Sequence, residues 1–168
     1  MTDFNSLGLG GLVNFGPAPI DNTQNKRIHV KFMNRMVGCA TEQARMILNR
    51  VWTKFGRVVK IHYPESWSYC FLSFGSHGEA EAAMNELNDQ GRFTTTAKLV
   101  LQQVQAQLAL EIISASNNQL LLEAASQKIK TFKRVANLLG FPASRFPLSA
   151  IRASWASPSS NNQNSHHY

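Results

Sequence analysis

The chain has 168 residues, with 17 Lys and Arg against 10 Asp and Glu and a formal net charge of +7. This length favours one domain with extensions, and two cysteines are too few for a disulfide framework. No apolar run reaches the roughly 18 residues of a membrane span, and the N-terminus lacks the features of a secretory signal. We therefore expect an intracellular protein, in the nucleus or the cytoplasm or both, with no membrane partner.

The first 25 residues contain six glycines and prolines and no charge beyond Asp3 and Asp21. This composition predicts a disordered leader over residues 1–25. The leader also contains large apolar side chains, which are either a short docking motif or merely tolerated: Phe4, Leu7, Leu9, Leu12 and Phe15.

A first strand is expected over residues 28–33, followed by an amphipathic helix. Thr41 can cap that helix, with Glu42 favoured in its first turn by the helix dipole. Gly56 is expected to end it in a left-handed conformation. The apolar residues at helical spacing that predict its inward stripe are Ala44, Ile47, Leu48, Val51, Trp52 and Phe55.

A second strand is expected over residues 58–63 and a third over residues 67–74, separated by a short turn. Ser76 and Glu79 then form a capping box at the start of a second helix. Residues 89–97 are expected to be a turn-rich approach to a last strand, Lys98 to Val104. These elements predict one α/β domain over residues 26–104, in which a four-stranded antiparallel sheet is backed by two helices.

After that domain the pattern becomes helical, and residues 105–153 are expected to be a helical extension. Its main helix runs from Leu120 to Leu139, with Gly140 and Pro142 ending it. Four basic residues are interleaved with its apolar stripe: Lys128, Lys130, Lys133 and Arg134. Three alternatives remain for this basic helix. Its charges extend a surface that binds a polyanion such as RNA, or they are solvated while the apolar stripe packs on the domain or a partner, or the helix lies on a membrane. Residues 154–168 are rich in Ser, Asn and Gln and are expected to be a disordered tail.

The third strand carries the most informative pattern in the chain. Alternation would point Cys70, Leu72 and Phe74 to one side, and Tyr69 and Phe71 to the other. Two aromatic residues on the outer side of a half-buried strand are unusual unless they have a function there. Exposed rings can stack on unpaired nucleic-acid bases.

The strands around Ile28–Met33 and Trp67–Phe74 resemble the paired signature strands of the RNA recognition motif family. Tyr69, Phe71, Leu72 and Phe74 occupy family positions. The sequence departs from the pattern at Trp67 and Ser68, where the family has a basic residue and glycine. It also departs at two further positions, where Cys70 replaces Gly or Ala and His29 replaces a stacking aromatic. The resemblance covers about residues 26–104 and implies the order β-α-β-β-α-β of a ferredoxin-like sheet.

The resemblance further implies that the two signature strands lie side by side at the centre of the sheet. Their outward residues, His29, Tyr69 and Phe71, would then form a platform for two or three bases. Lys31, Lys60 and His62 are expected on the same face, where they could reach phosphates or base edges. A related subgroup binds peptides through an acidic first helix and an Arg-any-Phe loop. The basic first helix and the contiguous Arg92-Phe93 depart from that subgroup.

The charge distribution agrees with a polyanionic partner. Residues 26–62 carry nine Lys and Arg against Glu42 alone, and residues 106–168 carry six against two acids. No carboxylate pair, zinc-ligand spacing or phosphate-binding glycine loop is present. We therefore expect no enzyme activity, no metal and no cofactor.

We accordingly expect a single-stranded RNA-binding protein that acts in post-transcriptional control of mRNA. Because one such motif usually binds weakly, a protein partner is expected through the C-terminal helices. Two alternatives to RNA binding remain for the face that carries His29, Tyr69 and Phe71. Either the C-terminal helix covers it, or it binds a protein and the chain is an interaction adaptor.

Overall fold

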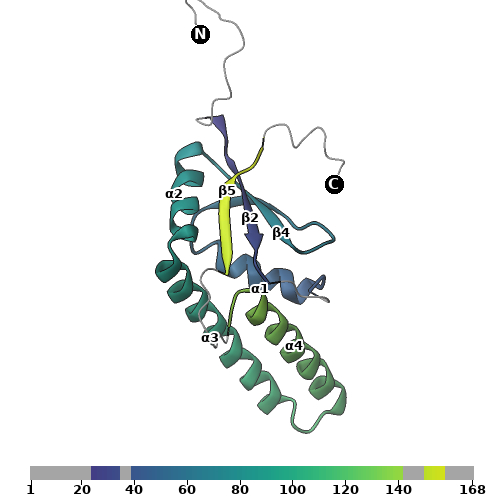
Figure 1. The fold of residues 1–168 in the computed structure, drawn as a ribbon. Helices are drawn as coiled ribbons and strands as arrows, with labels where there is room; N and C mark the ends of the chain where they lie inside the picture. The colour runs from purple at the N-terminus through teal and green to yellow at the C-terminus, as the bar shows by residue number, and fades with distance from the viewer. Residues whose placement is uncertain (1–23, 35–38, 142–149, 158–168) are drawn as a thin grey trace, which may run out of the picture.

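The computed structural model describes residues 24–34, 39–141 and 150–157, which form an α+β fold (Figure 1). Four antiparallel strands make one sheet in the order β3-β4-β2-β5, with helices against it. The elements in chain order are β2 (Arg27–Phe32), α1 (Glu42–Trp52), β3 (Val58–His62), β4 (Tyr69–Phe74), α2 (His77–Asn88), α3 (Gln90–Ser114), α4 (Gln119–Leu138) and β5 (Ile151–Trp155).

Helix α1 begins as the sequence predicts, because the Thr41 hydroxyl accepts a hydrogen bond from the Ala44 N–H at 3.1 Å. Its predicted stripe is buried, from Ala44 to Trp52, and Phe55 joins the same core. The expectation for Gly56 is wrong, because its φ angle is not positive. The residue is instead small for a steric reason: an added Cβ would lie 2.9 Å from Cε2 of Phe74.

Among the described residues, one face of the sheet is buried under helices and no helix lies on the other. Ile28 and Val30 of β2 and Leu72 of β4 are fully buried against the helices, as the strand alternation predicts. The register pairs His29 with Phe71 and Lys31 with Tyr69, so the residues between the buried ones point to the opposite side. We call that side the outer face. The predicted core positions of β2 and β4 are therefore confirmed.

The predicted last strand, Lys98 to Val104, is wrong. These residues lie within α3, which runs from Gln90 to Ser114 and is capped by the Asp89 carboxylate accepting from the Arg92 N–H at 3.0 Å. The expected turn at residues 89–97 is also helical. The reason is the helical spacing of the buried side chains Phe93, Ala97, Val100, Leu101, Val104 and Leu108.

The strand that completes the sheet is β5, which pairs antiparallel with β2. It spans residues that the sequence analysis divided between a helical extension and a disordered tail, so both of those expectations are corrected here. The predicted boundary at residue 104 falls inside α3. The segment 1–23 of the predicted leader and the segment 158–168 of the predicted tail lie outside the described residues.

Helices α3 and α4 form an antiparallel hairpin that extends beyond the sheet (Figure 1). The predicted helix over residues 120–139 is confirmed as α4, and Gly140 follows it in the left-handed region with φ 94°. The hairpin precedes β5 in the chain, rather than following the last strand as expected. It packs against α1 through α3 and α4 both.

Strand β5 is tied to α2 by the Asn88 side chain and by the stacking of His77 on Trp155, with ring centroids 4.7 Å apart. The Asn88 amide donates to the Ala153 carbonyl at 2.8 Å, and its oxygen accepts from the Ala153 N–H at 2.8 Å. The two hydrogen bonds occupy backbone groups that an edge strand otherwise leaves available for another chain. Asn88 thus both holds β5 in place and blocks that part of the sheet edge.

We expect Asn88→Asp to lower the free energy of unfolding by about 1–3 kcal/mol, because a carboxylate cannot donate to the Ala153 carbonyl. Urea unfolding followed by circular dichroism measures this change. Asn85→Asp, on an exposed position of the same helix, adds the same charge and is expected to stay within about 0.5 kcal/mol of the wild type. Equal losses in both variants would contradict the role given to the Asn88 amide.

Candidate nucleic-acid interface

Three rings from the two central strands form one cluster on the outer face. The ring centroid of His29 lies 4.9 Å from that of Tyr69 and 5.3 Å from that of Phe71. Tyr69 and Phe71 are 5.4 Å apart, in an edge-to-face arrangement. All three side chains are half-buried, because each shields the next. The pairing of β2 with β4 thus brings together the three residues predicted as the platform.

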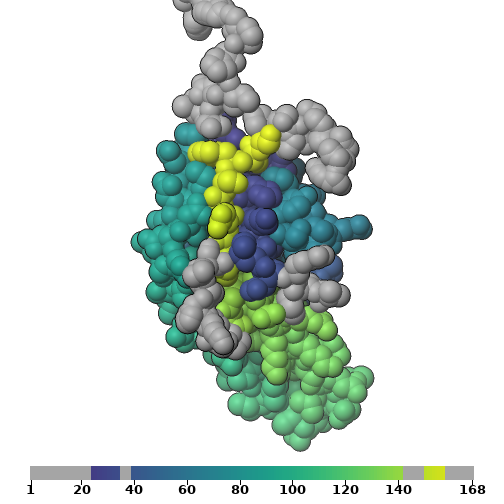
Figure 2. Space-filling view, in the orientation of Figure 1, coloured from purple at the N-terminus to yellow at the C-terminus, as the bar shows by residue number. Residues whose placement is uncertain are grey.

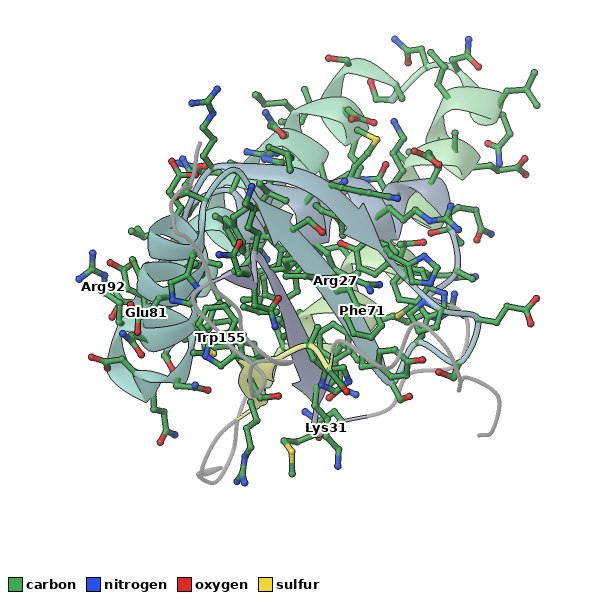
Figure 3. All side chains as sticks on the ribbon, turned by 90° about the horizontal axis from the view of Figure 1, so that it is seen from above. Arg27, Lys31, Phe71, Glu81, Arg92 and Trp155 are labelled. Atoms are coloured by element: carbon green, nitrogen blue, oxygen red, sulfur yellow. The ribbon has the colours of Figure 1, made fainter. Side chains whose placement is uncertain are left out.

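A fourth ring and a guanidinium extend this cluster toward β3. His62 stacks beside Phe71, with centroids 6.2 Å apart. The Arg27 Cζ lies 3.9 Å from the Phe71 centroid, within cation–π range. Figure 3 shows Arg27 beside Phe71, on the side of the sheet away from α2, whereas Trp155 lies toward α2.

An open pocket of about 320 Å³ lies at this end of the outer face, lined by Arg27, Lys60, His62, Phe71 and Ser73. Its walls combine an aromatic ring, two cationic side chains and an imidazole. Such a pocket suits a group that is both flat and anionic. The predicted residues Lys60 and His62 therefore lie beside the aromatic cluster.

The sequence analysis missed Arg27 as a candidate, because the first strand was expected to begin at Ile28. The signal was nevertheless present, since Arg27 stands two residues before His29 and must share its side of a strand. Arg152 was also missed. It is exposed and pairs in register with Lys31, so it continues the outer face onto β5.

The outer face is basic throughout. Its strands carry Arg27, Lys31, Lys60 and Arg152, and none of the four strands contains Asp or Glu. Unopposed positive charge on one face raises the local concentration of polyanions. Lys31 and Lys60 are exposed, as expected for residues that reach phosphates.

The position of His29 favours its neutral form. Burial lowers the pKa of His29, and the nearby charges of Lys31 and Arg27 lower it further. Burial also lowers the pKa of Arg27, yet a guanidinium stays charged in proteins. At neutral pH His29 is therefore an uncharged ring between fixed cations.

Trp67 stands where the signature of the resembled family has a basic residue, and it has a structural role. It is 4 % exposed and stacks on Tyr63, with centroids 4.8 Å apart and planes 8° from parallel. The Tyr63 hydroxyl accepts from Trp52 Nε1 at 2.9 Å and donates to Asn49 Oδ1 at 2.6 Å. Trp67 therefore belongs to the core and supplies no charge to the outer face.

Helix α4 does not lie on the aromatic cluster. It packs against α1 and α3, on the helical side of the fold, so the alternative in which it covers the rings is not what the structure has. Lys128 donates to Glu111 at 3.0 Å. Lys130, Lys133 and Arg134 are exposed. Asn34, just after β2, donates to the Asn137 carbonyl at 2.9 Å and places the end of α4 next to the end of β2.

Metal-binding and membrane-spanning features were also sought. Within residues 24–34, 39–141 and 150–157, no group of three or more His, Cys, Asp or Glu is placed to hold a metal ion. None of the helices in these ranges is long and apolar enough to cross a membrane.

Comparison of the chain with models of protein families, with curated proteins and with solved structures found no match. The functional reading of the outer face therefore depends on its own geometry and chemistry.

Proposed function

We propose that this protein binds single-stranded RNA on the outer face of its sheet and acts in post-transcriptional control of mRNA. The observation that carries the proposal is the coincidence of three clustered rings and four cationic side chains on a face whose strands have no acid. Rings offer stacking surfaces to unpaired bases, and the cations offer contacts to the backbone.

We further propose that the fold is an RNA recognition motif with a helical hairpin inserted before its last strand. Without α3 and α4, the element order is β-α-β-β-α-β, which is the order of that family. The central position of β2 and β4 supports the same reading. The hairpin replaces the short connection that the sequence analysis expected between the second helix and the last strand.

The geometry favours a single strand over a duplex. The rings are half-buried side by side and present a platform, and a platform can stack only on bases that are not already stacked. In an RNA duplex the bases are stacked on one another, and side chains cannot enter the deep major groove. The pocket beside Phe71 is lined by two cations, Arg27 and Lys60, and cations beside stacking rings are what proteins use to contact the backbone of a single strand.

The alternative is an interaction adaptor whose sheet no longer meets RNA. It is favoured by the loss of the basic signature residue at Trp67, now in the core, and by His29 in place of a larger ring. Titration of the full chain with a pool of random single-stranded RNA separates the two functions. Saturable binding that exceeds binding to duplex RNA supports the proposal, and absence of saturable binding supports the adaptor.

The electrostatic part of binding is expected to be separable from stacking. Lys60→Ala should weaken binding to all sequences and reduce the slope of log K against log salt by roughly 0.7, the value for one phosphate contact on a single strand. Fluorescence anisotropy at several salt concentrations measures the slope.

Lys98→Ala is the matched control, because Lys98 is exposed on α3 rather than on the sheet. It should leave the slope close to that of the wild type. A slope for Lys60→Ala that equals the control would remove Lys60 from the interface.

A further inference from the structure

The loop end of the α3–α4 hairpin exposes large apolar side chains. Leu110 and Ile113 on α3 are 64 % and 69 % exposed, and Leu120 and Leu121 on α4 are 77 % and 55 % exposed. We call these four residues the tip surface. They are half of the eight large apolar side chains that stand exposed in the described residues. Such clustering on one end of a molecule marks an interaction surface rather than scattered exposure.

The tip surface contains both a groove and projecting side chains. The groove has a volume of about 300 Å³ and runs between Leu110 and Leu121, over the small residues Ser114, Ala115 and Ala124. Ile113 and Leu120 are the two most exposed members of the tip surface and project into solvent rather than line the groove. A surface that pairs with itself across a two-fold axis must offer a hole and a matching projection on the same patch. The tip surface offers both.

The charges near the tip make it the end at which two copies of this chain would repel each other least. Residues 109–128 contain Glu111, Glu123 and Lys128, whereas the whole chain carries +7. The basic charge is therefore elsewhere, and two copies would meet at ends where repulsion is least. Glu111 and Lys128, paired at 3.0 Å on the rim of the groove, supply opposite charges to each side of a two-fold interface.

We propose that the tip surface is the site at which two copies of this chain associate, by packing their hairpins into a four-helix arrangement. The tip lies at the far end of the hairpin from the sheet (Figures 1 and 2). At about 1.5 Å per residue, the 25 residues of α3 span roughly 37 Å. Association there leaves the outer face of each copy open, and the inference does not depend on what that face binds.

Sedimentation equilibrium of the full chain tests the proposal. The wild type is expected to show a monomer–dimer equilibrium with Kd in the micromolar range. Leu120→Glu and Leu121→Glu should each raise that Kd at least tenfold, because the two-fold axis brings the added charges into one apolar interface. Circular dichroism should remain that of the wild type, since both positions are exposed.

Leu99→Glu is the matched control, because Leu99 has the same 55 % exposure as Leu121 but lies on α3 outside the tip surface. It should leave the Kd unchanged. A wild type that stays monomeric up to about 100 μM, far above the affinities of stable specific interfaces, overturns the proposal. Equal weakening by Leu99→Glu and Leu121→Glu also overturns it.

The apolar N-terminal residues are the rival occupant of the groove. A full-chain variant with Phe4, Leu7 and Leu9 replaced by serine should remain dimeric, and its dissociation would assign the groove to that segment instead. The tip variants also separate this proposal from the RNA proposal. A short single-stranded RNA that one copy can cover should bind Leu120→Glu and wild type equally, whereas a long RNA should bind the wild type more tightly through avidity.

Discussion

Replacing Trp52 with alanine is expected to lower the free energy of unfolding by about 3–5 kcal/mol. Trp52 is fully buried and lies 6.1 Å from Phe32, between centroids, where α1 meets the sheet. Its indole N–H also donates to the Tyr63 hydroxyl. The substitution would therefore leave a large cavity and remove one of the two partners of a partly buried hydroxyl. This loss is a large part of the stability of an ordinary domain.

Thermal unfolding measures the effect, and a loss of this size should lower Tm by roughly 6–20 °C in a chain of this length. Met46→Ala is the matched control, because Met46 lies on the same helix and is mostly exposed. It should change the free energy of unfolding by no more than about 0.5 kcal/mol. A Trp52→Ala variant that melts within a degree or two of the wild type would show that the α1 stripe does not organise the core.

The second large effect concerns the aromatic platform. Tyr69→Ala and Phe71→Ala are each expected to weaken binding of single-stranded RNA by about 1–3 kcal/mol and to leave the salt slope nearly unchanged. Each substitution removes a ring but no charge. Phe71→Ala should have the larger effect, because Phe71 also supports the Arg27 guanidinium at 3.9 Å and contacts His29 and His62.

Anisotropy titrations at fixed salt measure these losses, and crosslinking with sequencing of bound RNA beside the double alanine variant extends the test to cellular transcripts. Tyr69→Phe and Phe71→Tyr keep a ring at each position and should bind nearly as well as the wild type. Because the side chains are half-buried, circular dichroism must first show that the alanine variants are folded. A folded double variant with wild-type affinity would remove the platform mechanism while leaving the fold intact.

The local pattern of apolar residues was sufficient to predict the elements that bury one face and expose the other. The α1 stripe, the Thr41 cap and the inward residues of β2 and β4 are all where the sequence predicts them. The ring cluster followed from the same alternation, because a strand with Leu72 inside must have Phe71 outside. Arg27 could have been predicted on the outer face if the first strand had been extended by one residue toward the N-terminus. Arg152 could not have been predicted there, because β5 was not predicted as a strand.

The hairpin shows where local pattern failed. The run from Leu99 to Leu101 is short and apolar, and such a run fits a strand or a buried helix equally well. Gly91 and the threonines at 94–96 disfavour a helix locally. The helix forms because α1, α2 and α4 together bury one side of α3. These are tertiary contacts, and the one with α1 joins segments about forty positions apart, so the run by itself does not reveal them.

The sequence by itself determined the inward residues of α1, β2 and β4, because burial in these elements follows periodicity, and periodicity is local. It therefore placed three rings and two lysines on one face of a predicted sheet. Only the tertiary structure decided which segment closes that sheet. Ile151 to Trp155 becomes a strand because β2 has an open edge and Asn88 bonds the backbone of Ala153. Neither condition can be read from five residues, because both partners lie more than sixty positions away.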